Sequence, residues 1–182
     1  AFDFLNQFHA MEHYDQIVYD VLGDVVCGGF AVPVRRQYAN AVFLVTSGES
    51  MAIYAANNIL CGIKNLNPNG SQIAGIIYNS RGVGDESKRV EDFAQAVHLP
   101  ILARIPRSSS FAQAEKEAMT LVEKDPDSTE AKIFLELAGK LLNQPRLYPA
   151  QPLSEEQMEL FMRGDTPSQA TAPVQEKKPA VV

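Results

Sequence analysis

The chain has no tryptophan, only two cysteines, and no concentration of positive charge. Cys27 and Cys61 lie in very different sequence settings and do not make a disulfide framework, so we expect a reducing compartment. The net charge of -6 and the pI near 5.1 argue against nucleic-acid binding, because phosphate groups are bound by a basic face. These absences predict an acidic protein with no nucleic-acid partner.

Long apolar runs are also missing. No stretch approaches the roughly 20 apolar residues that span a bilayer, and residues 1–9 lack the basic start and apolar core of a signal peptide. A cytoplasmic protein with no membrane partner is therefore expected. The chain begins with Ala1 rather than Met, inside a stretch that predicts a helix over residues 2–11, so we expect a fragment or a processed product.

The 182 residues, of which 46% are hydrophobic, suffice for one α/β domain with a core. Apolar runs typical of buried strands alternate with segments in which apolar residues recur at helical spacing. This alternation predicts a parallel sheet flanked by helices. The predicted strands cover residues 16–22, 41–46, 72–78 and 101–105, and the predicted helices cover residues 49–65, 85–97, 111–118 and 128–143.

Finer predictions concern two of these helices. Ser47 is the predicted N-cap of the helix over residues 49–65. Cys61, in the same helix, has apolar neighbours and is predicted to be a small buried hydrophobic residue rather than a ligand. The apolar stripe predicted for the helix over residues 128–143 consists of Ala131, Phe134, Leu135, Ala138, Leu141 and Leu142.

The composition divides the chain into three parts. Residues 1–145 form the predicted α/β domain. Residues 146–164 form an extension with a short helix from Ser154, and its Leu153, Met158 and Phe161 are expected to pack on the domain or on a dimer partner. Residues 165–182 are rich in Pro, Ala, Thr and Gln with almost no large apolar groups, which predicts a disordered tail.

The segment from Tyr19 to Phe30 is the one most indicative of chemistry. In a parallel α/β sheet, ligands lie beyond the carboxyl ends of the strands, where Asp20 and Asp24 would emerge. Carboxylates there can hold Mg²⁺, directly or through water, and can orient a water toward a nucleotide phosphate. Cys27, followed by two glycines, suits a metal or redox ligand, but a tight turn with an incidental thiol explains it about as well.

From Asp20 to Arg35 the sequence is Asp-Val-Leu-Gly-Asp-Val-Val-Cys-Gly-Gly-Phe-Ala-Val-Pro-Val-Arg, which resembles the nitrogenase iron protein family almost residue for residue. The resemblance covers residues 1–164. It implies the later part of a P-loop NTPase type α/β domain, and an ATP-dependent electron donor. In that family a [4Fe-4S] cluster lies on the axis of a homodimer, and Cys27 would be one of two ligands from each subunit. Asp20, through a water on Mg²⁺, and Asp24 would match the segment that senses the γ-phosphate of MgATP.

Other positions extend the resemblance. The stretch from Val45 to Ile59 is similar to the family's next strand and helix. Two loops that surround the adenine in family members correspond to residues 79–81 and 105–107, so that Asn79, Pro106 and Arg107 become candidate nucleotide contacts. Taken alone, each loop is ordinary turn chemistry after a strand.

The resemblance also implies partners. Arg35 matches a surface arginine used for docking on the catalytic component. That component would be a nitrogenase molybdenum-iron protein, or a reductase of tetrapyrroles or methylthio-alkanes served by a similar donor. Ferredoxin or flavodoxin would supply the electrons.

The chain departs from the family pattern in several places. Ser108 stands where an acidic residue is usual and Phe134 where a tyrosine is usual, which predicts an altered adenine pocket. The phosphate-binding pattern Gly-x-x-x-x-Gly-Lys-Ser/Thr does not occur, and the family's first cluster cysteine would lie shortly before Ala1. The 182 residues alone are therefore expected neither to bind ATP tightly nor to hold the cluster.

Two alternatives come from other classes. His9-Ala10-Met11-Glu12-His13 matches the inverted zincin pattern, in which two histidines one helical turn apart bind zinc and the glutamate is the general base. A zinc peptidase needs a third ligand, and His98 has no supporting motif, so two polar residues on a solvated helix face are the simpler interpretation. A cluster-free regulatory relative is the other alternative, and Cys27 in its Gly-rich setting argues against it.

Overall fold

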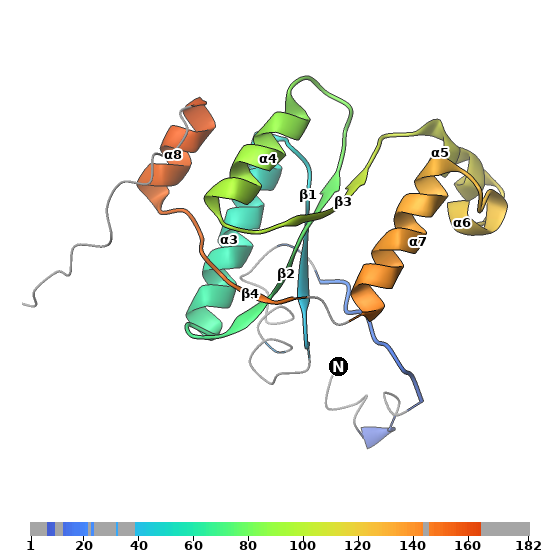
Figure 1. Ribbon diagram of the computed structural model, residues 1–182, viewed down its shortest axis with the longest axis horizontal. Coiled ribbons are helices and arrows are strands. Elements are labelled where there is room, and N and C mark those ends of the chain that lie inside the picture. The colour runs from blue at the N-terminus through green and yellow to red at the C-terminus, as the bar shows by residue number, and fades with distance from the viewer. Residues whose placement is uncertain are drawn as a thin grey trace, which may run out of the picture.

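The computed structural model describes residues 7–9, 13–21, 23, 32, 39–143 and 146–164, and within them the fold is α/β. Strands β1 (Val42–Thr46), β2 (Ser71–Asn79) and β3 (Ile101–Ile105) pair in parallel in the order β1-β2-β3. The short strand β4 (Tyr148–Pro149) pairs antiparallel with the start of β2. The parallel sheet predicted from the sequence is confirmed for three of its four predicted strands, with one antiparallel strand added (Figure 1).

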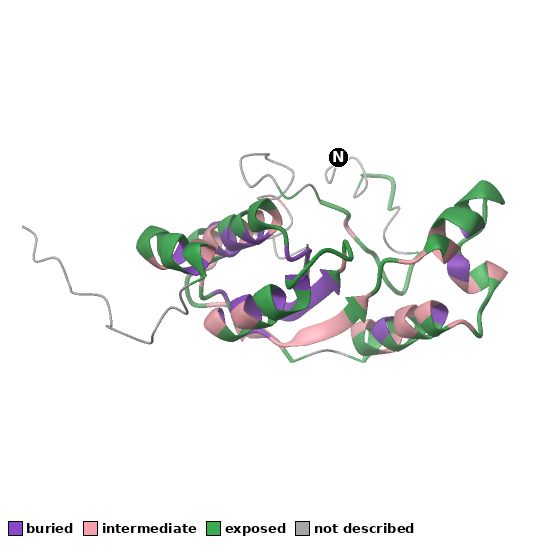
Figure 2. Cartoon of the chain, turned by 90° about the horizontal axis from the view of Figure 1, so that it is seen from above, coloured by how far each residue is buried: buried purple, intermediate pink, exposed green. Residues whose placement is uncertain are grey.

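Helices cover both faces of this sheet. Those described are α3 (Ser50–Leu66), α4 (Glu86–Ala96), α5 (Ser109–Lys116), α6 (Leu121–Lys124), α7 (Thr129–Leu142) and α8 (Glu155–Arg163). Helices α3, α4 and α8 share one hydrophobic core with the strands, whereas α7 lies on the other side, against β3 (Figure 1). Buried residues gather on the sheet and on the inner sides of the helices (Figure 2).

The central strand is buried on both faces. All residues of β2 are buried except Ser71 and Asn79 at its ends, as expected for a strand between helical layers. At Gly75 the backbone has φ +153°, and a Cβ atom there would lie 2.6 Å from Pro100 O. Glycine therefore permits the close approach of β2 to the segment that leads into β3.

Residues 146–164 pack back onto the same domain. The side chain of Asn57 on α3 donates to Leu153 O at 3.0 Å and accepts from Leu153 N at 2.8 Å. Met158 and Phe161 of α8 are buried in the core, and the Phe161 ring meets Phe93 of α4 edge-on at a centroid distance of 6.0 Å. Two amide hydrogen bonds and one aromatic contact thus fix the path of the chain into α8.

Two predictions near the amino terminus differ from the structure. The strand predicted over residues 16–22 is wrong for its described part, because residues 16–21 form no strand and Val18 is 87% exposed. An apolar run becomes a strand only when a neighbour supplies its hydrogen bonds, and none of the described strands pairs with it. Most of the helix predicted over residues 2–11 lies outside the described residues, and His9 has φ +50°, which is not right-handed helical.

Two finer predictions, for α3 and α7, also differ from the structure. The N-cap of α3 is Glu49 rather than Ser47, whose hydroxyl instead donates to Glu49 Oε2 at 3.2 Å. In the stripe predicted for α7, Ala131 is buried and Phe134 and Leu141 are partly buried, but Leu135 at 51%, Ala138 and Leu142 at 58% are exposed, and Leu137, outside the stripe, is buried. Helix α7 carries apolar residues on both sides, so its helical period alone could not select the face that packs on β3.

Cys61 is only partly buried, rather than fully so. Burial still raises the pKa of its thiol, although the nearby Lys64 opposes this. No helix among the described residues is both long enough and apolar enough to cross a membrane.

Candidate functional site

The loops that follow β2 and β3 lie side by side at the carboxyl ends of the strands. Asn79 pairs with Ile105 in the sheet register, and Ser80 N donates to Ile105 O at 2.9 Å. A Cβ atom at Gly82 would lie 3.6 Å from Arg107 Cβ, so the two loops touch. The structure therefore brings the predicted nucleotide contacts Asn79, Pro106 and Arg107 to one edge of the sheet, and all three are exposed.

A buried carboxylate organises this edge. Glu86, the first residue of α4, is only 6% exposed. Its Oε2 accepts hydrogen bonds from Gly82 N at 3.0 Å, Val83 N at 3.3 Å and Ser80 Oγ at 3.3 Å. Its Oε1 accepts from Gly48 N at 3.2 Å, in the loop after β1, and Arg81 N lies 3.0 Å from both oxygens. One side chain thus binds two loops that are far apart in the sequence.

These hydrogen bonds set the protonation of Glu86. Burial raises its pKa, but donation by the backbone amides of Arg81, Val83 and Gly48 and by the Ser80 hydroxyl outweighs burial, so the pKa of Glu86 lies below the ordinary 4.5. No cation forms an ion pair with Glu86 within the described part of the chain. Neutral donors alone therefore keep this carboxyl ionised at neutral pH.

Gly48 is held from two sides by α4. While its N–H binds Glu86, its carbonyl accepts from Arg89 Nη1 at 3.3 Å, and the same nitrogen of Arg89 donates to Ser50 Oγ at 3.0 Å. A Cβ atom at position 48 would lie 2.4 Å from Glu86 Cγ and from Glu86 O. Only glycine allows this close contact between the loop after β1 and the first turn of α4.

The residues that depart from the family pattern have structural roles beside this edge. Ser108 is the N-cap of α5 and accepts from Ser110 N at 3.2 Å. A hydrogen bond from Ser108 is also the main cause that lowers the pKa of Glu130 at the start of α7. Phe134 of α7 packs edge-on against Phe111 of α5 at a centroid distance of 5.9 Å.

The predicted cluster and magnesium residues are not assembled by the described residues. Asp20 is exposed and lies outside any strand, whereas Asp24, Cys27 and Arg35 lie outside the described residues. A Cβ atom at Gly23 would lie 3.6 Å from Ile59 Cδ1, so this position borders the middle of α3. The segment's relation to the loops after β2 and β3 therefore stays a prediction.

The zinc alternative loses its geometric basis. It requires His9 and His13 on successive turns of a helix, but His9 has φ +50° and His13 is in a turn, while Glu12 lies outside the described residues. No group of three or more His, Cys, Asp or Glu side chains able to hold a metal occurs among the residues that the structure describes.

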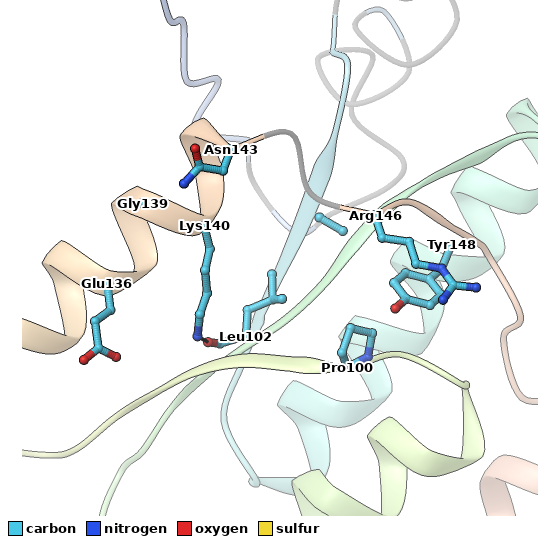
Figure 3. A pocket seen from close by; sticks show the side chains of 9 residues that line it. Pro100, Leu102, Glu136, Gly139, Lys140, Asn143, Arg146 and Tyr148 are labelled. Carbon is cyan, nitrogen blue, oxygen red and sulfur yellow. Dashed lines mark hydrogen bonds between the residues drawn. The ribbon is translucent and has the colours of Figure 1, made fainter.

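A hollow of about 700 Å³ lies elsewhere, between α7 and the strands (Figure 3). Lys140 reaches from α7 to donate to Leu102 O at 2.5 Å, and the Arg146 guanidinium lies 5.2 Å from the centre of the Tyr148 ring. The charged groups of Lys140 and Arg146 therefore both already have partners within the chain. None of the predicted site residues that the structure describes lines this hollow.

Sequence reasoning did not identify Glu86. An acidic residue in the first turn of a helix is usual because it interacts favourably with the helix dipole, so Glu86 looked ordinary. The available signal was the Gly-Val-Gly segment just before it, whose backbone amides need an acceptor. Nothing in the sequence indicated that Gly48, 38 residues earlier, would share that acceptor.

Comparison with known proteins identifies relatives of the chain. Residues 1–166 match the family described as "4Fe-4S iron sulfur cluster binding proteins, NifH/frxC family". The chain is 41% identical over 152 residues to nitrogenase iron protein 2 of Methanothermobacter thermautotrophicus, covering 84% of this chain and 56% of that protein. It is 42% identical over 171 residues to the nitrogenase iron protein of Methanospirillum hungatei, covering 92% of this chain and 61% of that protein.

A solved structure was also compared. The Pyrococcus furiosus cell division ATPase MinD has 26% sequence identity and a TM-score of 0.45, over 56% of this chain and 42% of that chain. The chain spans a little more than half the length of the curated relatives it matches. Because the family match extends over residues 1–166, the chain belongs to the NifH/frxC family of 4Fe-4S iron-sulfur cluster binding proteins.

Proposed function

We propose that this chain is the carboxy-terminal portion of an ATP-dependent electron donor. Such a donor passes electrons from a subunit-bridging [4Fe-4S] cluster to a nitrogenase catalytic component, coupled to MgATP hydrolysis. The observation that carries the proposal is the segment from Asp20 to Arg35, with Cys27 at its centre, inside a family match over residues 1–166. In the whole protein this chain would complete a P-loop NTPase type domain.

The exposed edge formed by the loops after β2 and β3 supports a nucleotide role. Ligands of parallel α/β sheets bind beyond the carboxyl ends of the strands, which is where Asn79, Pro106 and Arg107 lie. We assign these three residues to adenine contacts. Asp20 and Asp24 would respond to the γ-phosphate, Asp20 through a water on Mg²⁺.

The cysteines of the chain fit an iron-sulfur cluster that is shared between two subunits. Thiolates are the usual ligands of [4Fe-4S] clusters, which supply one-electron transfer when bound. Cys27 has two glycines beside it, whereas Cys61 lies within α3 and burial raises the pKa of its thiol. Cys27 is therefore the ligand we assign, and a homodimer would combine Cys27 and one upstream cysteine from each subunit.

The partners follow from the same assignment. Arg35 would dock on a catalytic component such as the nitrogenase molybdenum-iron protein, and ferredoxin or flavodoxin would reduce the cluster. The alternative is the donor component of a nitrogenase-like reductase that acts on tetrapyrroles or methylthio-alkanes. Reduction assays with purified catalytic components of each kind would separate these possibilities.

The proposal is tested on the chain expressed together with the coding sequence upstream of it, hereafter the extended protein. Iron and sulfide are reconstituted without oxygen, and electron paramagnetic resonance is recorded on the reduced protein with and without MgATP. We expect a [4Fe-4S] signal that shifts with MgATP, disappears in Cys27→Ala and persists in Cys61→Ala. A protein that takes up no cluster, or whose cluster is indifferent to Cys27→Ala, would sink the proposal.

A further inference from the structure

We propose that Glu86 is a positioning residue of the nucleotide edge. Its carboxylate ties the loop after β1 to the loop after β2 and thereby holds Asn79 and Arg107 in place for an adenine nucleotide. The inference rests on the proposed function, because it takes this edge as the adenine site.

The two carboxylate oxygens of Glu86 accept hydrogen bonds from two different loops. Oε1 accepts from Gly48 N, in the loop after β1, and Oε2 accepts from Ser80 Oγ, Gly82 N and Val83 N, in the loop after β2. An ionised carboxylate can satisfy both loops at once, since both of its oxygens accept. A glutamine has only one accepting oxygen and must release one of the two loops.

The clamped loop is the one that carries Asn79 and supports Arg107. Gly82 and Gly84 have φ +75° and +51°, conformations that glycine adopts at little cost. Because glycine also adopts many other conformations, these two residues alone do not hold the loop in this shape. Gly82 lies against the Arg107 side chain, and Asn79 ends the strand from which the loop departs. Loss of the Glu86 contacts would therefore loosen the loop next to both residues.

An ordinary role at the helix start does not account for this geometry. An interaction with the helix dipole needs only a place in the first turn, whereas Glu86 is also 6% exposed and reaches an amide 38 residues away. The charged groups around it have other partners: Arg81 lies 3.7 Å from Glu49, and Arg89 binds Gly48 O and Ser50. Glu86 instead binds the backbone of the loops.

The test compares Glu86→Gln with Asp92→Asn in the extended protein. Asp92 is a matched control because its carboxylate lies on the same helix but is partly exposed and bound to Lys88, also on α4. Amide hydrogen exchange of residues 47–50 and 79–84 is measured by mass spectrometry, and dissociation constants are measured for MgADP and MgGDP. Ser80→Ala, which removes one donor to Glu86, is a milder second variant in case Glu86→Gln folds poorly.

We expect Glu86→Gln to speed exchange in both loops and to weaken MgADP binding about ten-fold, the size of one lost hydrogen bond to a charged group. MgGDP binding should change by less than about two-fold, so the preference for adenine falls, which a general loss of stability would not cause. Ser80→Ala should act in the same direction, and Asp92→Asn should change neither quantity.

Other outcomes overturn the inference and are distinguishable. Unchanged exchange in Glu86→Gln and Ser80→Ala would show that the carboxylate does not hold the loops. Faster exchange with an unchanged ADP-to-GDP ratio would refute the positioning role but leave nucleotide binding intact. If the unsubstituted extended protein binds neither nucleotide, this edge is not an adenine site, and the proposed function is refuted as well.

Discussion

At the scale of single residues, Gly48 provides the sharpest test of the contact between α4 and the loop after β1. Gly48→Ala would place a methyl group 2.4 Å from two atoms of Glu86, one of them backbone. Because the backbone at Glu86 would have to move to avoid this clash, we expect the free energy of unfolding to fall by about 1–3 kcal/mol. Urea denaturation of the 182-residue chain measures this loss.

Gly139 is the control for that substitution. It lies within α7, and a Cβ atom there would meet nothing within 4 Å. Gly139→Ala should therefore stabilise the chain by about 0.5–1 kcal/mol, since alanine is the better helix former. If both variants lose stability equally, the close packing of Gly48 is not the cause.

The protonation of Glu86 predicts a pH dependence with a definite sign. Its pKa is lowered on folding, so its contribution to stability is complete above the unfolded value near 4.5 and is lost as the pH falls through the lower folded value. We expect Glu86→Gln to be less stable than the unsubstituted chain at about pH 7, and the difference to shrink at about pH 3. Denaturation curves at both pH values measure it, and a difference that grows in acid would contradict the assignment.

The sequence predicted where some candidate site residues lie, but not which buried side chain holds them together. Asn79, Pro106 and Arg107 were proposed from the family resemblance, and their nucleotide roles stay predictions, but the structure brings their loops together because parallel strands end at the same edge. Glu86 was missed because its role depends on Gly48, whose proximity follows from packing rather than from sequence spacing.

At the scale of elements, one side chain of α3 makes both amide hydrogen bonds that hold the segment leading into α8. Asn57→Ala would leave the buried N–H and C=O of Leu153 without their amide partners. We expect a loss of roughly 2–4 kcal/mol in the free energy of unfolding, because two buried polar groups become unsatisfied. Hydrogen exchange should also accelerate first in α8.

Asn58→Ala is the matched control for α8. Asn58 is the next residue of the same helix but is exposed, so its loss should change stability by less than about 0.5 kcal/mol. A similar loss in both variants would mean that the contacts with Leu153 do not determine the effect, because alanine is a better helix former than asparagine and helix propensity cannot cause the loss.

Elements defined by a long apolar run or by regular helical spacing were predicted well. The strand over residues 101–105 has the predicted bounds, and the ends of β1, β2, α3, α4 and α7 differ from prediction by at most one residue. Helix α6 was not predicted, because only its capping box of Thr120 and Glu123 marks a segment of four residues. The strand over residues 16–22 failed because pairing, which no single segment encodes, decides whether an apolar run becomes a strand.

At the scale of the whole molecule, the hydrophobic core is unevenly distributed. The largest fully buried side chains among the described residues all belong to β2, α3 and α4 or to Val97 at the end of α4. Helices α5, α6 and α7 contribute none of these and lie to one side of the sheet (Figure 1). Their contact with the rest of the domain runs mainly through α7 and β3.

This distribution predicts two levels of stability. Native-state hydrogen exchange should show the amides of β2 opening only with global unfolding, whereas those of α5 and α6 open at a lower free energy.

Phe134→Ala removes the contact between α7 and Phe111 and should lower protection of α5 to α7 by roughly 1–3 kcal/mol without changing β2. Phe161→Ala, which removes a ring from the main core, should lower protection in β2 as well. Because α5 begins two residues after Arg107, a loosely held α5 would let the proposed adenine edge adjust if a nucleotide binds there, and equal protection throughout the chain would exclude this.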